Sequence, residues 1–426
     1  MVDDKKIEVI DPLNIKTIYS NTVLDMAGEV IINHNVVFKN CTFRYIANEE
    51  KKFHIFAEVE FVDCVFNCVD YAKGDSGFIV VGESGGLKFK QCKFESCEKF
   101  IEGYDKFLSI EIRDSVLNNP GNLFLNVQAR DKAKIALSGI EARVMENVTY
   151  SGNTTVFRIA RWGMDASIEL DNIKITSANF KDNVKWFDCM GAQLSKGEFV
   201  NLSNVLFGFR SVVESKFVSC KKTINWSFPV VRDYGISKNT ISWINENTLI
   251  EKCDFTNCTM IAGLGKAAKV RDCKFRKCFA PIAVIGQLGG VHISHSRLIS
   301  CVLDGNDNNA FIICVMDQDK DFTVSKISNV QCENTQLSKN KFLRLDLAKD
   351  KYGIEKAYGT VFSLENLRFI NCGLSTRTEL IRDIVGKQEM RVVSFTPPID
   401  FHNDPVESKK TDIDSDKTGA DWFGDI

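Results

Sequence analysis

The sequence predicts an all-β fold in which short strands wind into a parallel solenoid. One phrase recurs along most of the chain: an apolar residue, two residues that often end in Asn or Asp, a small residue, any residue, and a second apolar residue. Many copies follow one another at spacings of about 20 to 28 residues, a period typical of solenoid repeats, and longer gaps of about 32 to 38 residues separate the others. Each copy therefore marks one coil, and we expect about twelve coils.

The residues of the phrase predict its local structure. The clearest copies are FKNCTF, FVDCVF, FKQCKF, IEKCDF and VRDCKF, which end at Phe43, Phe66, Phe94, Phe255 and Phe275. Strand alternation places the small residue and the final apolar residue on one face, so we expect these phenylalanines to be buried and stacked.

The residue before the small position is often Asn or Asp, as at Asn40 and Asp63. Both residue types tolerate left-handed backbone and hydrogen-bond to neighbouring amides, so we expect a sharp corner there. Val205 and Ser215 both match the small position but lie too close together to hold a coil between them. One of the two is therefore a false match.

The segments outside the regular phrases predict the remaining organisation. Residues 1–35 are expected to cap the N-terminal end, because an open terminal coil exposes strand amides to edge pairing. Residues 36–395 form the coils, with loop insertions near 145–168 and 221–248. Residues 396–426 contain three prolines and, from Asp400 onwards, eight acids against three lysines. We expect them to form a flexible acidic tail.

The phrases between Phe38 and Phe369 resemble those of the right-handed parallel β-helix superfamily, the pectate-lyase-like fold. The resemblance implies right-handed coils, an asparagine ladder in the turn between the second and third strands, and phenylalanines stacked inside. This fold hosts lyases, hydrolases, phage fibres and pure scaffolds, so the resemblance does not decide the activity.

Composition and charge argue against some classes of partner and favour one cellular location. The formal net charge is −2 and the sequence pI is about 6.3, which provides no long-range field for nucleic acid or an anionic membrane. There is no apolar run long enough to span a membrane and no secretory signal. With 15 cysteines, this favours free thiols in the cytoplasm. A phage particle released by lysis is an alternative location.

The cysteines do not predict a metal site. Cys64 and Cys68, like Cys253 and Cys258, are paired in sequence, but the same phrase position holds Ser, Val, Ile or Leu in other coils. A metal ligand would not tolerate those residues, so we expect buried thiols that act as small apolar side chains. We predict no metal and no cofactor.

The candidate binding residues come from the inserted segments and the tail. Tryptophan beside arginine offers a rigid face and directed donors, which suits a sugar or a protein partner. The C-terminal Trp–Phe pair lies among acids, as in short peptides that bind grooves, although it could instead cap the last coil. The predicted binding residues are Arg161, Trp162, Trp226, Arg232, Asp233, Trp243, Trp422 and Phe423.

We therefore expect a non-enzymatic scaffold that binds a protein or a polysaccharide. The signature segments of polygalacturonases and the nucleophile frames of hydrolases are missing. An alternative is a polysaccharide lyase or glycoside hydrolase, which could be phage-borne, because strand acids from distant coils can converge. A third hypothesis is an adaptor that recruits its partner through the acidic tail.

Overall fold

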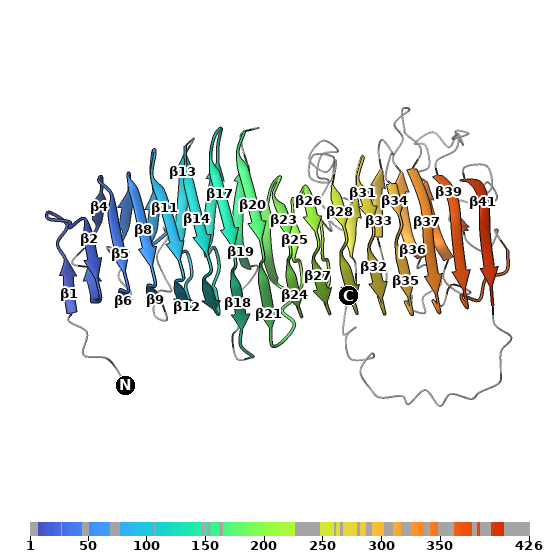
Figure 1. Cartoon of the computed structure of the whole chain (residues 1–426), viewed down its shortest axis with the longest axis horizontal. Helices are drawn as coiled ribbons and strands as arrows, with labels where there is room; N and C mark the ends of the chain where they lie inside the picture. The colour runs from blue at the N-terminus through green and yellow to red at the C-terminus, as the bar shows by residue number, and fades with distance from the viewer. Residues whose placement is uncertain are drawn as a thin grey trace.

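The computed structural model of the chain is a long stack of parallel strands that follow one another in chain order from β1 to β41 (Figure 1). The described residues contain no helix, and so none that could span a membrane. The structure describes residues 7–26, 28–44, 51–68, 77–105, 107–146, 148, 150, 154–161, 165–225, 248–259, 261–264, 267–278, 282–286, 292–301, 310–316, 325–335, 337, 341–347, 362–376, 381–383 and 393–403.

In the described part of the chain, the largest sheet, sheet A, has 28 strands and two arms that meet at a corner in each coil. The first arm contains β2 (Ile18–Ser20), β5 (Val36–Lys39), β8 (Glu58–Val62), β11 (Gly86–Lys90), β14 (Ser109–Arg113), β17 (Lys134–Ser138), β20 (Ser167–Asp171), β23 (Gln193–Ser195), β26 (Ser211–Val213), β28 (Leu249–Glu251), β31 (Lys269–Arg271) and β34 (His292–Ser294).

The second arm lies beyond the corner and contains β1 (Ile7–Ile10), β3 (Val23–Met26), β6 (Thr42–Arg44), β9 (Val65–Asn67), β12 (Lys93–Glu95), β15 (Val116–Asn118), β18 (Glu141–Val144), β21 (Lys174–Ser177), β24 (Glu198–Val200), β27 (Lys216–Val218), β29 (Asp254–Thr256), β32 (Lys274–Arg276) and β35 (Arg297–Ile299). Three long strands run through both arms: β37 (Ser325–Glu333), β39 (Phe362–Ile370) and β41 (Val393–His402).

The third strand of each coil belongs to one of two smaller sheets. Isolated bridges of Ile224 to Leu206 and to Ala262 connect these two sheets, so the third side of the solenoid is continuous there. Sheet B contains β4 (Val30–Ile32), β7 (Phe53–Ile55), β10 (Ile79–Val81), β13 (Ile101–Asp105), β16 (Leu125–Ala129), β19 (Thr154–Arg161), β22 (Val184–Cys189) and β25 (Leu206–Phe207). Sheet C contains β30 (Ala262–Leu264), β33 (Ile282–Gly286), β36 (Ala310–Met316), β38 (Lys341–Leu347) and β40 (Ile381–Asp383).

The predicted corners are confirmed by the backbone. Asn40, Asp63 and Asp114 have φ angles of 51°, 53° and 47°, in the left-handed region that Asn and Asp tolerate. The side chains also form short ladders, because Asn40 Nδ2 donates to Asn21 Oδ1 at 2.8 Å. The same backbone conformation occurs at Asn172, Asp272, His295, Asn329 and Asn366.

A second corner of the same kind closes the second arm. Ser96, Asn119 and Asn257 have φ angles of 53°, 51° and 54°. A buried cysteine follows Ser96 and Asn257, so each of these coils places a small residue at two corners. The repeat phrase covers only the first corner, which is why the second was not predicted.

The register shows which of the two competing anchors is correct. Lys216 pairs with Glu198, so Ser215 and Gly197 hold equivalent corner positions before these strands. Val205 instead precedes β25 in sheet B. Ser215 is therefore the true anchor, and Gly197 is an anchor that the apolar phrase did not identify.

The core is a set of aromatic stacks that run along the solenoid axis. Phe66 and Phe94 have ring centroids 5.2 Å apart and an interplanar angle of 8°. Phe255 and Phe275 are 5.1 Å apart at 5°. All four rings are at most 1% exposed, so the predicted burial and stacking are confirmed. The ring spacing matches the strand spacing of about 4.8 Å that parallel pairing imposes.

The cysteines at the corners act as hydrogen-bond donors. Cys92 Sγ donates to the carbonyl of Lys90 at 3.5 Å and to that of Phe61 in the preceding coil at 3.4 Å. Ser115 Oγ, at the same corner of the next coil, donates to the carbonyl of Arg113 at 2.7 Å. Cysteine and serine therefore fill one role, which explains why they interchange in the phrase.

Strands of the solenoid extend into three segments that we predicted to lie outside the regular coils. Within residues 1–35, β1 to β4 already pair with the sheets of the following coils. The expected insertion at 145–168 contains β19, whose Phe157 and Ile159 point into the core. Finally, β41 crosses position 396, because its apolar residues continue the core column.

We predict that Phe275→Ala lowers the free energy of unfolding by about 3–5 kcal/mol, because it removes a ring from a close-packed stack and leaves a cavity. Urea denaturation monitored by circular dichroism measures the change. Phe56→Ala is the matched control: Phe56 is 46% exposed, and the change should cost clearly less, about 1 kcal/mol, because much of the ring already lies in water. Equal losses in both variants would contradict the packing argument.

We also predict that stability falls as the pH rises above about 8.5, the ordinary thiol value. The neighbouring thiol of Cys253, followed by burial, raises the pKa of Cys273 well above that value. The unfolded chain therefore loses thiol protons before the folded chain does, so unfolding becomes easier by up to about 1.4 kcal/mol per pH unit for each such thiol. Urea midpoints between pH 7.5 and 9.5 measure the slope.

Cys273→Ser should reduce this pH slope by the contribution of one thiol, up to about 1.4 kcal/mol per pH unit, because serine keeps the hydrogen bond but does not ionise. Ser296→Ala is the control: it removes the hydrogen bond from Ser296 to the carbonyl of Ser294 and the one that Ser296 accepts from the amide of Cys273, without removing a thiol. It should lower stability equally at every pH. A slope that is identical in the wild type and in Cys273→Ser would exclude the thiol as its source.

Candidate functional site

One residue of the predicted binding set lies within the described part of the chain, and it ends a strand of sheet B. Arg161 is the last residue of β19 and is half-buried. Trp186, on the adjacent strand β22, belongs to the core, with 1% of its surface exposed. The other predicted residues lie outside the described residues: Trp162, Trp226, Arg232, Asp233, Trp243, Trp422 and Phe423.

Arg161 is held against the backbone of the next coil. A Cβ atom added to Gly191 would lie 2.6 Å from Arg161 Nη1, so the guanidinium covers this glycine. Gly191 has a φ angle of 76°, which L side chains rarely adopt. Glycine is therefore required both for the turn and for the placement of the arginine.

The outer face of sheet B carries a row of polar residues on four successive coils. Glu102 pairs with Asn126, Asn126 with Arg158, and Arg158 with Asp188. Their neighbours in each strand are buried, so strand alternation directs these four side chains outward. We call these four residues the sheet B ladder.

Glu102, at one end of the sheet B ladder, accepts hydrogen bonds through both of its carboxylate oxygens. Its Oε2 accepts from the amide of Gly77 at 3.0 Å, and its Oε1 accepts from Asn126 Nδ2 at 3.5 Å and from the hydroxyl of Tyr104. Burial, followed by the contact with Glu102, raises the pKa of Tyr104 to about 12, while the charge of Arg158 acts in the opposite direction. Tyr104 is therefore a protonated donor at neutral pH.

A basic residue lies at the other end of the ladder. Lys185 Nζ is 3.2 Å from Asp188 Oδ2 and lies 4.6 Å above the centroid of the Phe207 ring. Ion pairs as exposed as this one contribute at most about 1 kcal/mol to stability, so the lysine holds the acid in place without a large energetic role. The face as a whole combines acceptors and donors of both charges.

An aromatic pair adjoins the ladder. Phe56, Gly82 and Tyr104 follow residues that are paired across three neighbouring strands. The two rings are 46% and 45% exposed. A Cβ atom on Gly82 would lie 2.4 Å from Phe56 Cε1, so the Phe56 ring lies across the glycine. Ile31, 54% exposed on β4, extends the apolar surface. We call Phe56, Tyr104 and Ile31 together the exposed patch.

The two acids of the ladder are too far apart for glycoside hydrolysis. Glu102 and Asp188 are separated by three strand spacings, about 14 Å. Catalytic carboxyl pairs of glycosidases lie about 5–9.5 Å apart. The ladder and patch therefore offer stacking and hydrogen bonding, and this acid pair does not offer acid–base catalysis of that type.

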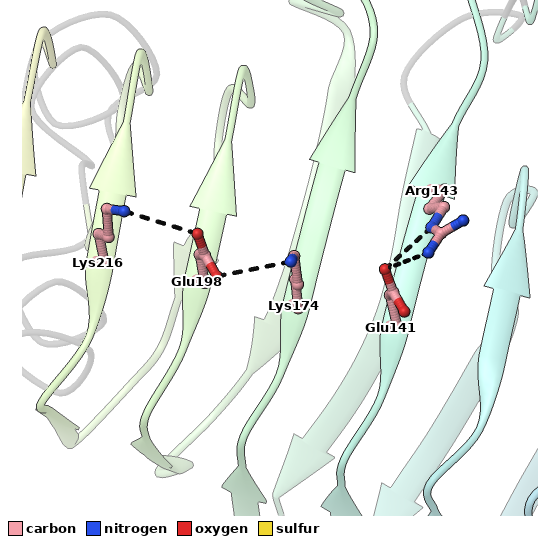
Figure 2. A network of polar contacts seen from close by, with 5 residues as sticks. All are labelled: Glu141, Arg143, Lys174, Glu198 and Lys216. Atoms are coloured by element: carbon pink, nitrogen blue, oxygen red, sulfur yellow. Dashed lines mark hydrogen bonds and ion pairs between the residues drawn. The ribbon is translucent and has the colours of Figure 1, made fainter.

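On a second charged surface, on the second arm of sheet A, the acidic and basic side chains pair with one another. Lys174 and Lys216 lie 3.8 Å and 3.7 Å from the carboxylate of Glu198, and Arg143 lies 2.7 Å from Glu141 (Figure 2). Opposite charges thus alternate on successive coils, which favours the in-register pairing of the strands. This surface is explained by folding and is not a candidate site.

The sequence contains a signal for the sheet B face that the repeat phrase did not use. The segment Ile101–Asp105 alternates buried Ile101 and Gly103 with outward Glu102 and Tyr104. A strand pattern whose outward positions hold an aromatic beside an acid could have indicated a surface. The phrase search found only the two arms of sheet A.

Among the described residues, no three His, Cys, Asp or Glu side chains are grouped so that they could hold a metal ion. No family model, curated protein or solved structure matches the chain. The candidate site therefore rests on the geometry of these residues.

We predict that Gly191→Ala lowers the free energy of unfolding by about 1–2 kcal/mol, because alanine is strained at a positive φ angle. Thermal and urea denaturation measure the loss. Gly28→Ala is the matched control, since a Cβ atom there would have no neighbour within 4 Å. A loss at Gly28 as large as that at Gly191 would contradict the role of the turn.

Proposed function

We propose that this protein is a non-enzymatic binding scaffold that engages its partner through the outer face of sheet B. The observation that carries the proposal is the half-exposed aromatic pair Phe56 and Tyr104, placed beside the ladder Glu102, Asn126, Arg158 and Asp188. Exposed rings next to directed donors and acceptors are a common feature of both sugar-binding and protein-binding surfaces.

The regular geometry of the face favours an extended partner. Successive ladder residues are about 4.8 Å apart along the solenoid axis, so a chain laid along that axis would meet a new polar group at each coil. A polysaccharide or a protein segment satisfies this requirement. Arg161 at the end of β19 lies on the same sheet, and Trp162 follows it directly in sequence.

The remaining expectations are consistent with this proposal. The repeat phrase supports right-handed coils of the pectate-lyase-like kind, and the weak net charge of −2 argues against a nucleic-acid or membrane partner. Buried thiols suit a reducing compartment, and a cytoplasmic location is therefore part of the proposal. Cleavage of a polysaccharide is the alternative function, and its acids would have to lie elsewhere than Glu102 and Asp188.

We predict that Tyr104→Ala weakens binding at least tenfold. The probe is an array of oligosaccharides and polysaccharides, screened with the fluorescently labelled protein and followed by calorimetric titration of the best ligand. The loss arises because the variant removes the ring and one hydrogen-bond donor to Glu102. Release of reducing ends or of unsaturated sugars is measured in the same samples, and such release would establish the enzymatic alternative.

Lys216→Ala is the matched control. Lys216 lies on the outer face of sheet A, so this substitution should leave binding unchanged. If no sugar binds, a photo-cross-linking residue at Gln128 on β16 tests for a protein partner in cell extract. Cross-links that appear equally from positions 128 and 216, together with no sugar binding, would refute this face as the binding surface.

A further inference from the structure

β41 is the last strand of the solenoid among the residues that the structure describes. β41 pairs with β39, and no described strand pairs with its other edge. Pro397 and Pro398 lie in the middle of β41 and provide no amide hydrogen. Proline within a sheet is characteristic of edge strands, because the missing donor blocks further pairing. The two prolines thus hinder pairing of β41 with another strand, but they do not cover the apolar side chains at this end of the core.

The apolar core column continues into β41 without being fully covered. Phe401 stacks on Phe369 with centroids 5.5 Å apart at 14°. In the preceding coil, Leu364, Leu367 and Phe369 are at most 1% exposed. Their counterparts in β41 are only partly buried, although they pack against the core: Phe395, Ile399 and Phe401.

The N-terminal end shows what a covered end looks like. Tyr19 is 3% exposed and stacks on Phe38 at 5.1 Å. Lys16 Nζ lies 5.6 Å above the Tyr19 ring and pairs with Glu8, while Ile15 packs against the core. Among the residues that the structure describes, no equivalent cover lies over Phe401.

We propose that the last six residues of the chain, Asp421–Ile426, cover the C-terminal end of the core, with Trp422 and Phe423 packed on Phe401 and Ile399. Beyond Asn403 the chain continues for 23 residues, whose only aromatic residues are Trp422 and Phe423. The 18 residues between Asn403 and Trp422 can span up to about 60 Å, so the chain can turn back to its own last coil.

The chemistry of the segment matches the surface that it would cover. Two rings and an aliphatic side chain can complete an aromatic column, while Asp421 and Asp425 stay in water at the rim. This inference does not depend on the proposed binding face, which lies in the other half of the molecule.

Hydrogen exchange read by mass spectrometry tests the proposal on the full chain. In the double variant Trp422→Ser and Phe423→Ser, deuterium uptake in the peptide 393–403 should be at least threefold faster than in the wild type, and uptake in the peptide 36–44 should not change. Ile413→Ser is the matched control, because it changes an aliphatic residue of the same tail and should leave both peptides unchanged. Equal uptake in the wild type and the double variant would overturn the proposal.

A second measurement identifies the occupant. A chain truncated after residue 403 should show the same fast uptake, and a synthetic peptide of residues 417–426 should restore the slow uptake of 393–403. Protection that depends on the protein concentration of the wild type would assign the cover to a second copy of the chain and overturn the proposal. Protection that is independent of concentration and restored by the peptide supports it.

Discussion

In-register parallel pairing is the constraint from which the rest of the molecule follows. Each residue lies about 4.8 Å from its counterparts in the adjacent coils, so every position must tolerate a copy of itself or a complement. Inside the solenoid, flat rings satisfy this requirement, as Phe43 and Phe66 do at 4.7 Å and 6°. Outside, like charges would repel, and Lys174, Glu198 and Lys216 accordingly alternate in sign.

At the corners, in-register pairing places polar groups of successive coils next to one another. A residue with left-handed backbone turns the chain at each corner. The small side chain that follows it in sequence can donate a hydrogen bond to carbonyls of its own coil and of the preceding coil. Cys258 Sγ shows this double role, with carbonyls of Thr256 and Phe217 at 3.3 Å and 3.4 Å. Burial, above all, raises the pKa of Cys258 and keeps it a thiol, so the richness in cysteine reflects hydrogen bonding in a narrow space.

The outer face of sheet B differs from this regular background. Phe56 and Tyr104 are separated by Gly82, so the column holds two exposed rings without a continuous stack. The ladder beside them changes from Glu102 to Asn126 to Arg158, which neither repeats nor simply alternates in charge. Stacking requirements do not explain this arrangement, and a partner that contacts both rows would explain it.

The sequence alone determined the parallel solenoid, the corners at Asn40 and Asp63, and the buried stack of Phe255 and Phe275, because these features repeat and depend on local backbone preferences. Only the tertiary structure decided that Ser215 and not Val205 is an anchor, since register is a property of paired strands. It also revealed the sheet B face. Glu102, Asn126 and Arg158 are far apart in sequence and belong to third strands of variable spacing, so only winding the chain places them side by side.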